Sequence, residues 1–335
     1  MMIPKPTPPS FKRLRQLLKS VWSRGSSGTV GAPLSKSVAV EQAAAYWNNV
    51  GTVPRKPRTR WWESKTIIRH INDKVCGEPV DGLHAGFHRL LAKEIGSKPA
   101  AKAVSVGAGT GFKERALLVS GVVQEFHLYE ISSERIRTGI EQAQKANIAD
   151  RMHFYQADAF EACAETNFDL VYWNNALHHM MDTSLAVRWS RDRLKDDGIF
   201  AMDDFIGPSR FQWTDTALGF ARQYRASLPA SMLSDPRDPS KPAKPIERPT
   251  VEYMLRMDPS EAADSSSILP ALHRTFSAPT VVMTGGAIYH AALNDILVNF
   301  DDDGTELKAA LALDHALSMM GENHYAVAIA RKTNP

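Results

Sequence analysis

Cysteine is scarce in this 335-residue chain, and long apolar runs are absent from it. The two cysteines, Cys76 and Cys163, lie far apart and outside any CxxC spacing, so they predict no disulfide framework and give no sign of secretion. No stretch approaches the roughly 20 uninterrupted apolar residues that a membrane-spanning helix needs. We therefore expect a cytoplasmic enzyme with one large core, or one core and an accessory region.

Acidic residues are missing from the first 40 positions, which hold seven lysines and arginines. The remaining 33 basic and 37 acidic residues give the rest of the chain a formal charge of −4. A body with net negative charge is a poor surface for nucleic acid, so no nucleic-acid partner is expected.

The basic tail, residues 1–37, contains an apolar pattern with helical spacing over residues 11–23. A basic amphipathic helix of this kind can lie on an anionic membrane surface, which would make the protein weakly peripheral to a membrane. An organellar targeting segment is one alternative, and a tail packed on its own domain or on nothing is another. The apolar positions are Phe11, Leu14, Leu17, Leu18, Val21 and Trp22.

Glycine occurs at every second position from Gly107 to Gly111, directly after an apolar run rich in β-branched residues. A helical pattern follows, which predicts a buried parallel strand, a tight turn and a helix N-terminus. Glycine permits positive φ and lets backbone amides approach a ligand closely. A second apolar strand ends at Glu130, where an acid can accept hydrogen bonds from both hydroxyls of a ribose. This combination predicts a nucleoside site.

Two other nucleotide motifs are absent. The dinucleotide motif GxGxxG needs a third glycine where this chain has Phe112, and a phosphate P-loop needs Gly-Lys-Ser/Thr. The GxGxG spacing therefore favours neither of these two sites.

Strand and helix patterns alternate over residues 101–206, which is typical of a doubly wound parallel sheet. Polar clusters follow the strands at their carboxyl ends, where ligands bind in open α/β sheets. Strands are predicted at 102–107, 124–130, 152–156, 168–173, 199–202, 281–283 and 325–330. The main helices are predicted at 40–48, 67–75, 82–95, 112–120, 132–147, 183–195, 287–299 and 305–319.

Residues 229–250 hold six prolines and many charges without periodicity, which predicts a functional lid or a disordered loop. The chain accordingly divides into five segments. These are the tail at 1–37, a helical cap at 38–99, the core at 100–206, a lid or insertion at 207–280, and the C-terminal part of the sheet at 281–335.

Together these motifs resemble the class I S-adenosylmethionine-dependent methyltransferases, over residues 100–206 and more loosely to residue 331. The resemblance implies a Rossmann-like, doubly wound, mostly parallel seven-stranded sheet with an N-terminal helical cap and a C-terminal lid insertion. It also implies S-adenosylmethionine as cofactor and S-adenosylhomocysteine as product. The implied cofactor residues are Val106, Gly107, Ala108, Gly109, Thr110, Gly111, Glu130, Ile131, Asp158, Ala159, Phe160 and Asn174.

Within that resemblance, Glu130 corresponds to the ribose acid and Asp158 to the residue that contacts the adenine amino group. Ala159 would offer a backbone amide, Phe160 apolar cover, and Asn174 would line the methyl-transfer site.

A finer resemblance concerns Gly207–Trp213 and Gly285–Ala287, which are similar to a bacterial subgroup acting on small molecules or glycans. It implies a hydroxyl or amine acceptor on such a molecule. Arg210, Gln212 and Trp213 are the substrate candidates, because they combine a forked donor, an amide and a flat apolar face. The alternative is that Trp213 is a core residue and Arg210 forms an ion pair at the surface.

The N-terminal part of the chain adds a dense aromatic and cationic set, from which Trp62 is a further substrate candidate. The set is either a helix-packing cluster or a lid that touches the ligand through Arg60 or Trp62. Its members are Tyr46, Trp47, Arg60, Trp61 and Trp62.

His178, His179 and Asp203 are the catalytic candidates. Methyl transfer is an in-line displacement, so the enzyme mainly aligns the acceptor with the methyl group. A base helps oxygen and nitrogen acceptors, and histidine titrates near neutrality. The alternative is that the histidine pair only shapes the pocket. A metal held by His178, Asp182, Asp203 and Asp204 is conceivable, but paired carboxylates at a strand end are more often capping residues, so no metal is expected.

Two other functions stay open. One is methylation of protein or RNA, which the acidic body and the sequence Asn174–Leu177, unlike the Asn-Pro-Pro-Tyr pocket for planar amides, make less favourable. The other is a scaffold or regulator that binds the cofactor without transferring the methyl group.

Overall fold

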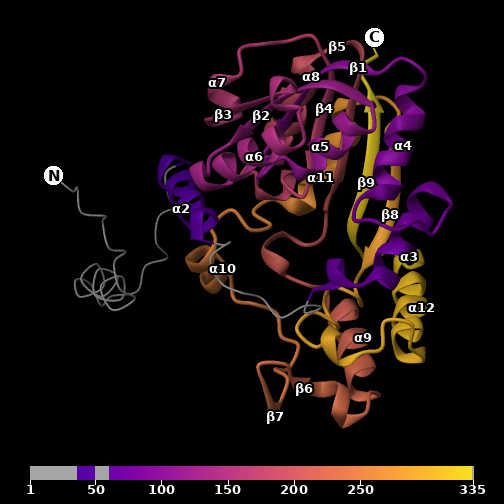
Figure 1. Ribbon diagram of the computed structural model, residues 1–335. Coiled ribbons are helices and arrows are strands. Elements are labelled where there is room, and N and C mark those ends of the chain that lie inside the picture. The colour runs from indigo at the N-terminus through magenta and orange to yellow at the C-terminus, as the bar shows by residue number, and fades with distance from the viewer. Residues whose placement is uncertain (1–35, 50–59, 334–335) are drawn as a thin grey trace, which may run out of the picture. The chain divides into compact units, whose positions relative to one another are not determined.

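The computed structural model describes residues 36–49 and 60–333 (Figure 1). The described residues from Ser37 onward belong to one compact unit. Nearly all of the basic tail, including the amphipathic helix predicted at 11–23, lies outside the described residues and stays a prediction. Among the helices that the structure describes, none combines the length and apolarity needed to cross a membrane.

A seven-stranded sheet organises this unit, in the order β3-β2-β1-β4-β5-β9-β8. Strands β1 to β5 pair in parallel, whereas β9 runs antiparallel to both β5 and β8. This confirms the predicted mostly parallel α/β fold. The strands are β1 (Ala100–Val106), β2 (Val123–Glu130), β3 (Met152–Gln156), β4 (Phe168–Asn174), β5 (Leu194–Phe205), β8 (Thr280–Gly286) and β9 (Asn323–Arg331), with a separate hairpin of β6 (Ser234–Asp235) and β7 (Asp238–Pro242).

Side chains of the central strands alternate between two apolar layers. Leu170 and Tyr172 of β4 pack with residues of α3, α4, α5 and α6, whereas Val171 and Trp173 pack with residues of α8 and α11. Helices therefore cover both faces, as the near-continuous apolar strands require. These helices are α3 (Lys65–Cys76), α4 (Ala85–Ile95), α5 (Phe112–Val119), α6 (Ser133–Lys145), α7 (Ala159–Ala162), α8 (Thr183–Arg193) and α11 (Ile268–Thr275).

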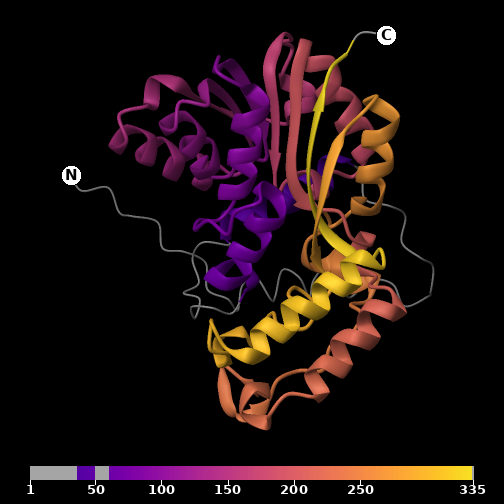
Figure 2. The same ribbon diagram turned by 90° about the vertical axis from the view of Figure 1, so that its right-hand side faces the viewer.

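Further helices lie beyond the carboxyl ends of the parallel strands. Among them, α9 and α12 lie side by side in both views (Figures 1 and 2), and the Tyr224 hydroxyl donates to the Glu306 carbonyl at 2.6 Å. The elements of this region are α2 (Lys36–Asn49), α9 (Asp215–Ala226), α10 (Val251–Met257) and α12 (Thr305–Met319).

The helix predicted at 287–299 is wrong. Residues 287–296 form turns, and only Leu297–Asn299 makes a short 3-10 helix. The cause is a distant side chain: the buried Asp314 of α12 accepts hydrogen bonds from the backbone amides of Gly286, Ile288 and Tyr289. The Asp314 carboxylate therefore fixes the chain after β8 in a conformation that local sequence does not encode.

We expect Gly285→Ala to destabilise the fold by about 2–4 kcal/mol, because it perturbs this contact. Gly285 has a φ of +91°, and a Cβ there would lie 1.9 Å from Asp314 Oδ2. The matched control is Gly219→Ala in α9, where a Cβ meets nothing within 4 Å. That helical change should stabilise by up to about 1 kcal/mol. Urea denaturation of both variants measures the difference, and equal stabilities would contradict this account.

Candidate active site

The glycine loop joins β1 to α5 in a conformation that suits glycine. Gly107, Gly109 and Gly111 have φ values of +64°, +60° and +65°. A Cβ on Gly111 would also lie 2.7 Å from the terminal methyl of Met152. The loop therefore depends on glycine both for its backbone angles and for close packing against β3.

Glu130 closes the end of β2 and holds the loop. Its side chain is buried, Oε2 accepts from the Gly109 amide at 2.8 Å, and Oε1 accepts from the Ser132 amide at 2.8 Å. A carboxylate oxygen can accept more than one hydrogen bond, so both oxygens keep capacity for a hydroxyl donor. Glu130 can thus position the loop and still bind a diol.

An open cavity of about 580 Å³ lies against this loop, between α2 and α6. The Arg135 guanidinium lies 4.1 Å from the centre of the Trp47 ring, a cation–π contact across the cavity wall. Asn48 accepts a hydrogen bond from the Ser132 hydroxyl at 2.6 Å. Helix α2 thus borders the glycine loop through two side-chain contacts. The lining comprises Trp47, Asn48, Gly107, Ala108, Gly109, Thr110, Phe112, Lys113, Glu134, Arg135, Arg137, Thr138 and Asn175.

The other predicted cofactor residues follow neighbouring strands outside that lining. Asp158 caps α7 and accepts from the Phe160 amide at 2.9 Å, and the Phe160 ring meets Trp189 edge-on. Asn174 is buried at the end of β4 and donates to the Tyr172 hydroxyl at 2.8 Å. Val106 ends β1, Ile131 follows β2, and Ala159 is buried at the start of α7. Their roles toward a cofactor stay predictions.

Lys113 is a cavity residue that the sequence reasoning missed. It lies in the first turn of α5, where its buried ammonium donates to the Asn174 carbonyl. Burial lowers the pKa of Lys113. The contact ties the start of α5 to the end of β4, where Asn174 was predicted to line the methyl-transfer site. The sequence did not predict this contact, because a lysine in the first turn of a helix is not a recognisable pattern.

His178 lies in a 3-10 turn after β4 and is held by a carboxylate of β5. Its Nδ1 is 2.5 Å from Asp204 Oδ1. Asp204 is fully buried and also accepts from the backbone amides of Ala176 and Leu177. Burial raises the pKa of Asp204, but His178 and these amides outweigh it, so the carboxyl has a lowered pKa and stays ionised. It therefore accepts the Nδ1 proton. Burial alone would lower the pKa of His178, but Asp204 and next Glu261 outweigh it and raise that pKa above its usual value.

His179 is held from another element, the loop that follows α10. Its Nδ1 lies 3.0 Å from the Ser260 hydroxyl, which itself donates to Asp258 at 2.6 Å. Burial, and next the neighbouring His178, lowers the pKa of His179 well below its usual value. The His179 ring therefore stays neutral, and it meets Trp47 edge-on at 5.3 Å.

Glu261, on the same loop, approaches the pair and was not predicted. Its Oε1 lies 3.6 Å from His178 Nε2. Burial raises the pKa of Glu261. Arg210 holds the loop in place by donating to the carbonyls of Pro259 and Glu261, at 2.6 and 3.2 Å. The local sequence could not predict that Glu261 lies near the histidines, because Arg210, a residue far away in the sequence, determines its position.

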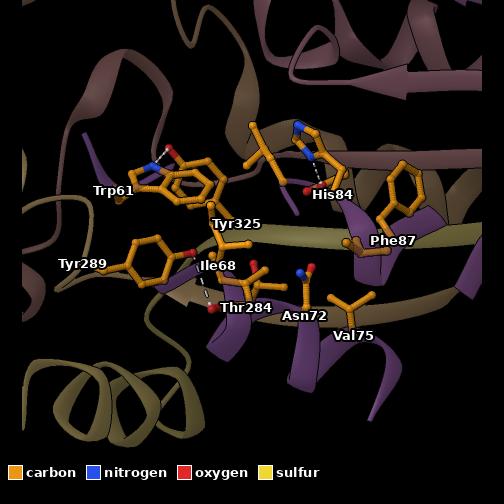
Figure 3. Close-up of a pocket in the computed structure, with 13 residues that line it drawn as sticks. Trp61, Ile68, Asn72, Val75, His84, Phe87, Thr284, Tyr289 and Tyr325 are labelled. Carbon is orange, nitrogen blue, oxygen red and sulfur yellow. Dashed lines mark hydrogen bonds and ion pairs between the residues drawn. The ribbon is translucent and has the colours of Figure 1, made fainter. Parts of the chain in front are cut away.

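Asp203 has a different partner from the histidine pair. Its Oδ2 lies 2.7 Å from Nδ1 of His84, a residue that sequence reasoning also missed. His84 precedes α4 with a φ of 67° and, with Asp203, lines a cavity of about 20 Å³ (Figure 3). That volume suffices for about one water molecule. The structure thus brings His178 and His179 together and pairs Asp203 with His84.

The substrate candidates make contacts within the protein. Gln212 donates to the carbonyls of Arg210 and Pro249. Trp213 is buried and stacks on Phe211 and on His324. The Trp62 side chain is 37% exposed and meets Trp61 edge-on. These contacts support core and loop-holding roles, and substrate binding by Arg210, Gln212, Trp213 and Trp62 stays a prediction.

Comparison with known proteins bears on this site. Residues 97–237 match a family model described as "Methyltransferase domain". The chain is 34% identical over 77 residues to 27-O-demethylrifamycin SV methyltransferase of Amycolatopsis mediterranei, and 29% identical over 144 residues to a sterol 24-C-methyltransferase of Gibberella zeae. The matches cover 23% and 41% of this chain. They span only 28% and 36% of the two relatives' own lengths.

The fold has solved counterparts. Geranyl diphosphate C-methyltransferase from Streptomyces coelicolor A3(2) superposes with a TM-score of 0.52 at 14% identity, covering 90% of this chain and 100% of that one. The family match is thus confined to residues 97–237, and the likeness to the solved structure shows a shared fold.

Proposed function

We propose that the protein transfers a methyl group from S-adenosylmethionine to a hydroxyl or amine of a small molecule or glycan. One observation carries the proposal. Trp47 contacts Arg135 beside the glycine loop and also contacts His179 of the histidine pair. The cavity proposed for the cofactor and the proposed proton-transfer group therefore lie on either side of one tryptophan. Methyl transfer to oxygen or nitrogen needs such a neighbourhood.

In this proposal, different residues bind the cofactor and assist the transfer. S-adenosylmethionine, when bound, supplies an activated methyl group on a sulfonium. Glu130 accepts hydrogen bonds from the ribose, and the glycine loop leaves its amides accessible. The histidine pair, held by Asp204 and Ser260, assists the loss of the acceptor's proton. Residues 38–99 serve as a cap over this site and residues 207–280 as a lid.

The relatives support a small-molecule acceptor. The rifamycin enzyme is named for a 27-O position, whereas the sterol enzyme and the geranyl diphosphate enzyme are named as C-methyltransferases. The two imidazoles favour oxygen or nitrogen over carbon here, because those atoms carry an exchangeable proton that a neighbouring group can remove.

Calorimetry and label transfer test the proposal together. Wild-type protein should bind S-adenosylmethionine with a stoichiometry of one per chain, and S-adenosylhomocysteine with the same stoichiometry. It should then move a labelled methyl group onto hydroxyl- or amine-bearing members of an acceptor panel. Absence of cofactor binding would refute the proposal, and label found only on carbon would refute the acceptor class. Binding without transfer to any acceptor would favour the scaffold alternative.

A further inference from the structure

Three side chains near the turn after β4 lie close to one another. One potential ligand atom from each of His178, His179 and Glu261 lies within 4.8 Å of the others. Two metal–ligand bonds of about 2.0–2.1 Å that meet at a tetrahedral angle hold their ligand atoms about 3.3–3.4 Å apart. A closing movement of up to about 1.5 Å, within the reach of side-chain rotation, would therefore let all three bind a single ion.

Both imidazoles are already oriented as metal ligands usually are. The Nδ1 atom of His178 faces the ionised Asp204 at 2.5 Å. Nδ1 of His179 faces the Ser260 hydroxyl, and because that hydroxyl donates to Asp258, it can only accept from the ring. A second hydrogen bond of this kind fixes the tautomer of metal-binding histidines. The other ring nitrogen, Nε2, is then the atom of each histidine that would bind the ion.

We infer that His178, His179 and Glu261 bind a divalent transition-metal ion. Two imidazoles and one carboxylate suit zinc, iron(II) or manganese(II), whereas magnesium and calcium prefer oxygen ligands. Three protein ligands leave at least one coordination position for an oxygen or nitrogen of the acceptor, as in catalytic zinc sites.

This ligand set differs from the one conceivable from sequence. Asp182 caps α8, Asp203 pairs with His84, and Asp204 lies behind His178 as its hydrogen-bond partner. The loop after α10 supplies the carboxylate instead, through Glu261. The sequence pattern did not point to Glu261, because this residue lies far from the histidine pair along the chain.

The inference rests on the proposed function and deepens it. A divalent ion lowers the pKa of a coordinated hydroxyl. The acceptor's O–H bond breaks with its proton leaving to water, an oxygen electron pair forms the bond to the methyl carbon, and the carbon–sulfur electron pair stays with sulfur. The histidine pair then assists the proton's loss as ligands of the ion and no longer as bases.

Metal titration of the full-length protein, first stripped with a chelator, tests the site directly. Zn²⁺ calorimetry should give one ion per chain, and Co²⁺ should give the visible absorption of a nitrogen- and oxygen-ligated ion. We expect His178→Ala, His179→Ala and Glu261→Gln each to weaken binding by more than ~10²-fold, and Ser260→Ala by ~10–100-fold. The control is His153→Ala, whose side chain is partly exposed and pairs with Glu125.

Cofactor calorimetry on the same variants keeps the two proposals separable. Each variant should still bind S-adenosylmethionine, which shows that it is folded. Failure of the wild type to bind an ion, or ion binding that the ligand variants leave unchanged, would overturn the metal site while leaving the proposed methyl transfer intact. Transfer at the full rate after verified removal of the ion would overturn its role in the reaction. Restoration of the rate by added Zn²⁺ or Mn²⁺ would support it.

Discussion

Asp204→Ala is expected to lower the free energy of unfolding by about 3–5 kcal/mol, the range for breaking a buried charged pair. The carboxylate is fully buried and accepts from His178 Nδ1 and from the backbone amides of Ala176, Leu177 and Phe205. Alanine would leave these donors without a partner in the interior, and each unsatisfied group costs about 1–3 kcal/mol. Partial relaxation makes the total smaller than the sum.

Asp204→Asn is the matched control for that result. Asparagine keeps the volume and one acceptor oxygen but brings an amide that cannot accept from the remaining donors. Its loss of stability should therefore be intermediate. Urea denaturation monitored by circular dichroism measures all three proteins. A loss below about 1 kcal/mol for Asp204→Ala would mean that the turn after β4 does not depend on this carboxylate.

Glu130→Ala should weaken binding of S-adenosylmethionine by at least ~10²-fold. A hydrogen bond to a charged group contributes about 1.5–3 kcal/mol, so two bonds from a ribose correspond to roughly 10²–10⁴ in affinity. The substitution also removes the acceptor for the Gly109 and Ser132 amides, which loosens the loop itself. Calorimetry with the cofactor and with S-adenosylhomocysteine gives the two dissociation constants.

Glu130→Gln separates the contributions of charge and shape. It keeps one acceptor oxygen and the side-chain volume, so we expect an affinity between those of the wild type and Glu130→Ala. The thermal unfolding of each variant shows whether the loop change spreads to the fold. If Glu130→Ala binds the cofactor within about threefold of the wild type, a difference of well under 1 kcal/mol, the ribose contact is excluded.

The parallel half of the sheet was predictable because its signals are local. Apolar runs marked the strands, and the alternating glycines marked the turn after β1, with strand β3 matching its predicted limits. The region after β8 was not predictable, since Asp314 of α12 captures amides that a helix would otherwise use. A pattern of neighbouring residues cannot reveal a hydrogen bond to a side chain 26 residues away in the sequence.

The candidate site divides in the same way. Glu130 ends strand β2 and the histidine pair lies in the turn after β4, so their positions could be inferred from strand order. Glu261 lies near the pair because Arg210 holds its loop, a contact between segments with no shared periodicity. The aromatic residues also lie in two separate places. Trp47 borders the cavity beside the glycine loop, whereas Trp61 packs with Tyr289 and Tyr325. The sequence showed that these aromatic residues were present, but it did not show which of them would be in contact.

The position of β9 has a consequence for synthesis on the ribosome. Residues 323–331 pair with both β5 and β8, so the sheet stays incomplete until the ribosome has passed Arg331 and released that segment from its tunnel. Until then Ile199–Phe205 presents an apolar strand edge, the kind of surface that recruits other chains. The glycine loop and Glu130 emerge much earlier. The edge of β5 therefore stays unpaired for some time after the glycine loop and Glu130 have emerged.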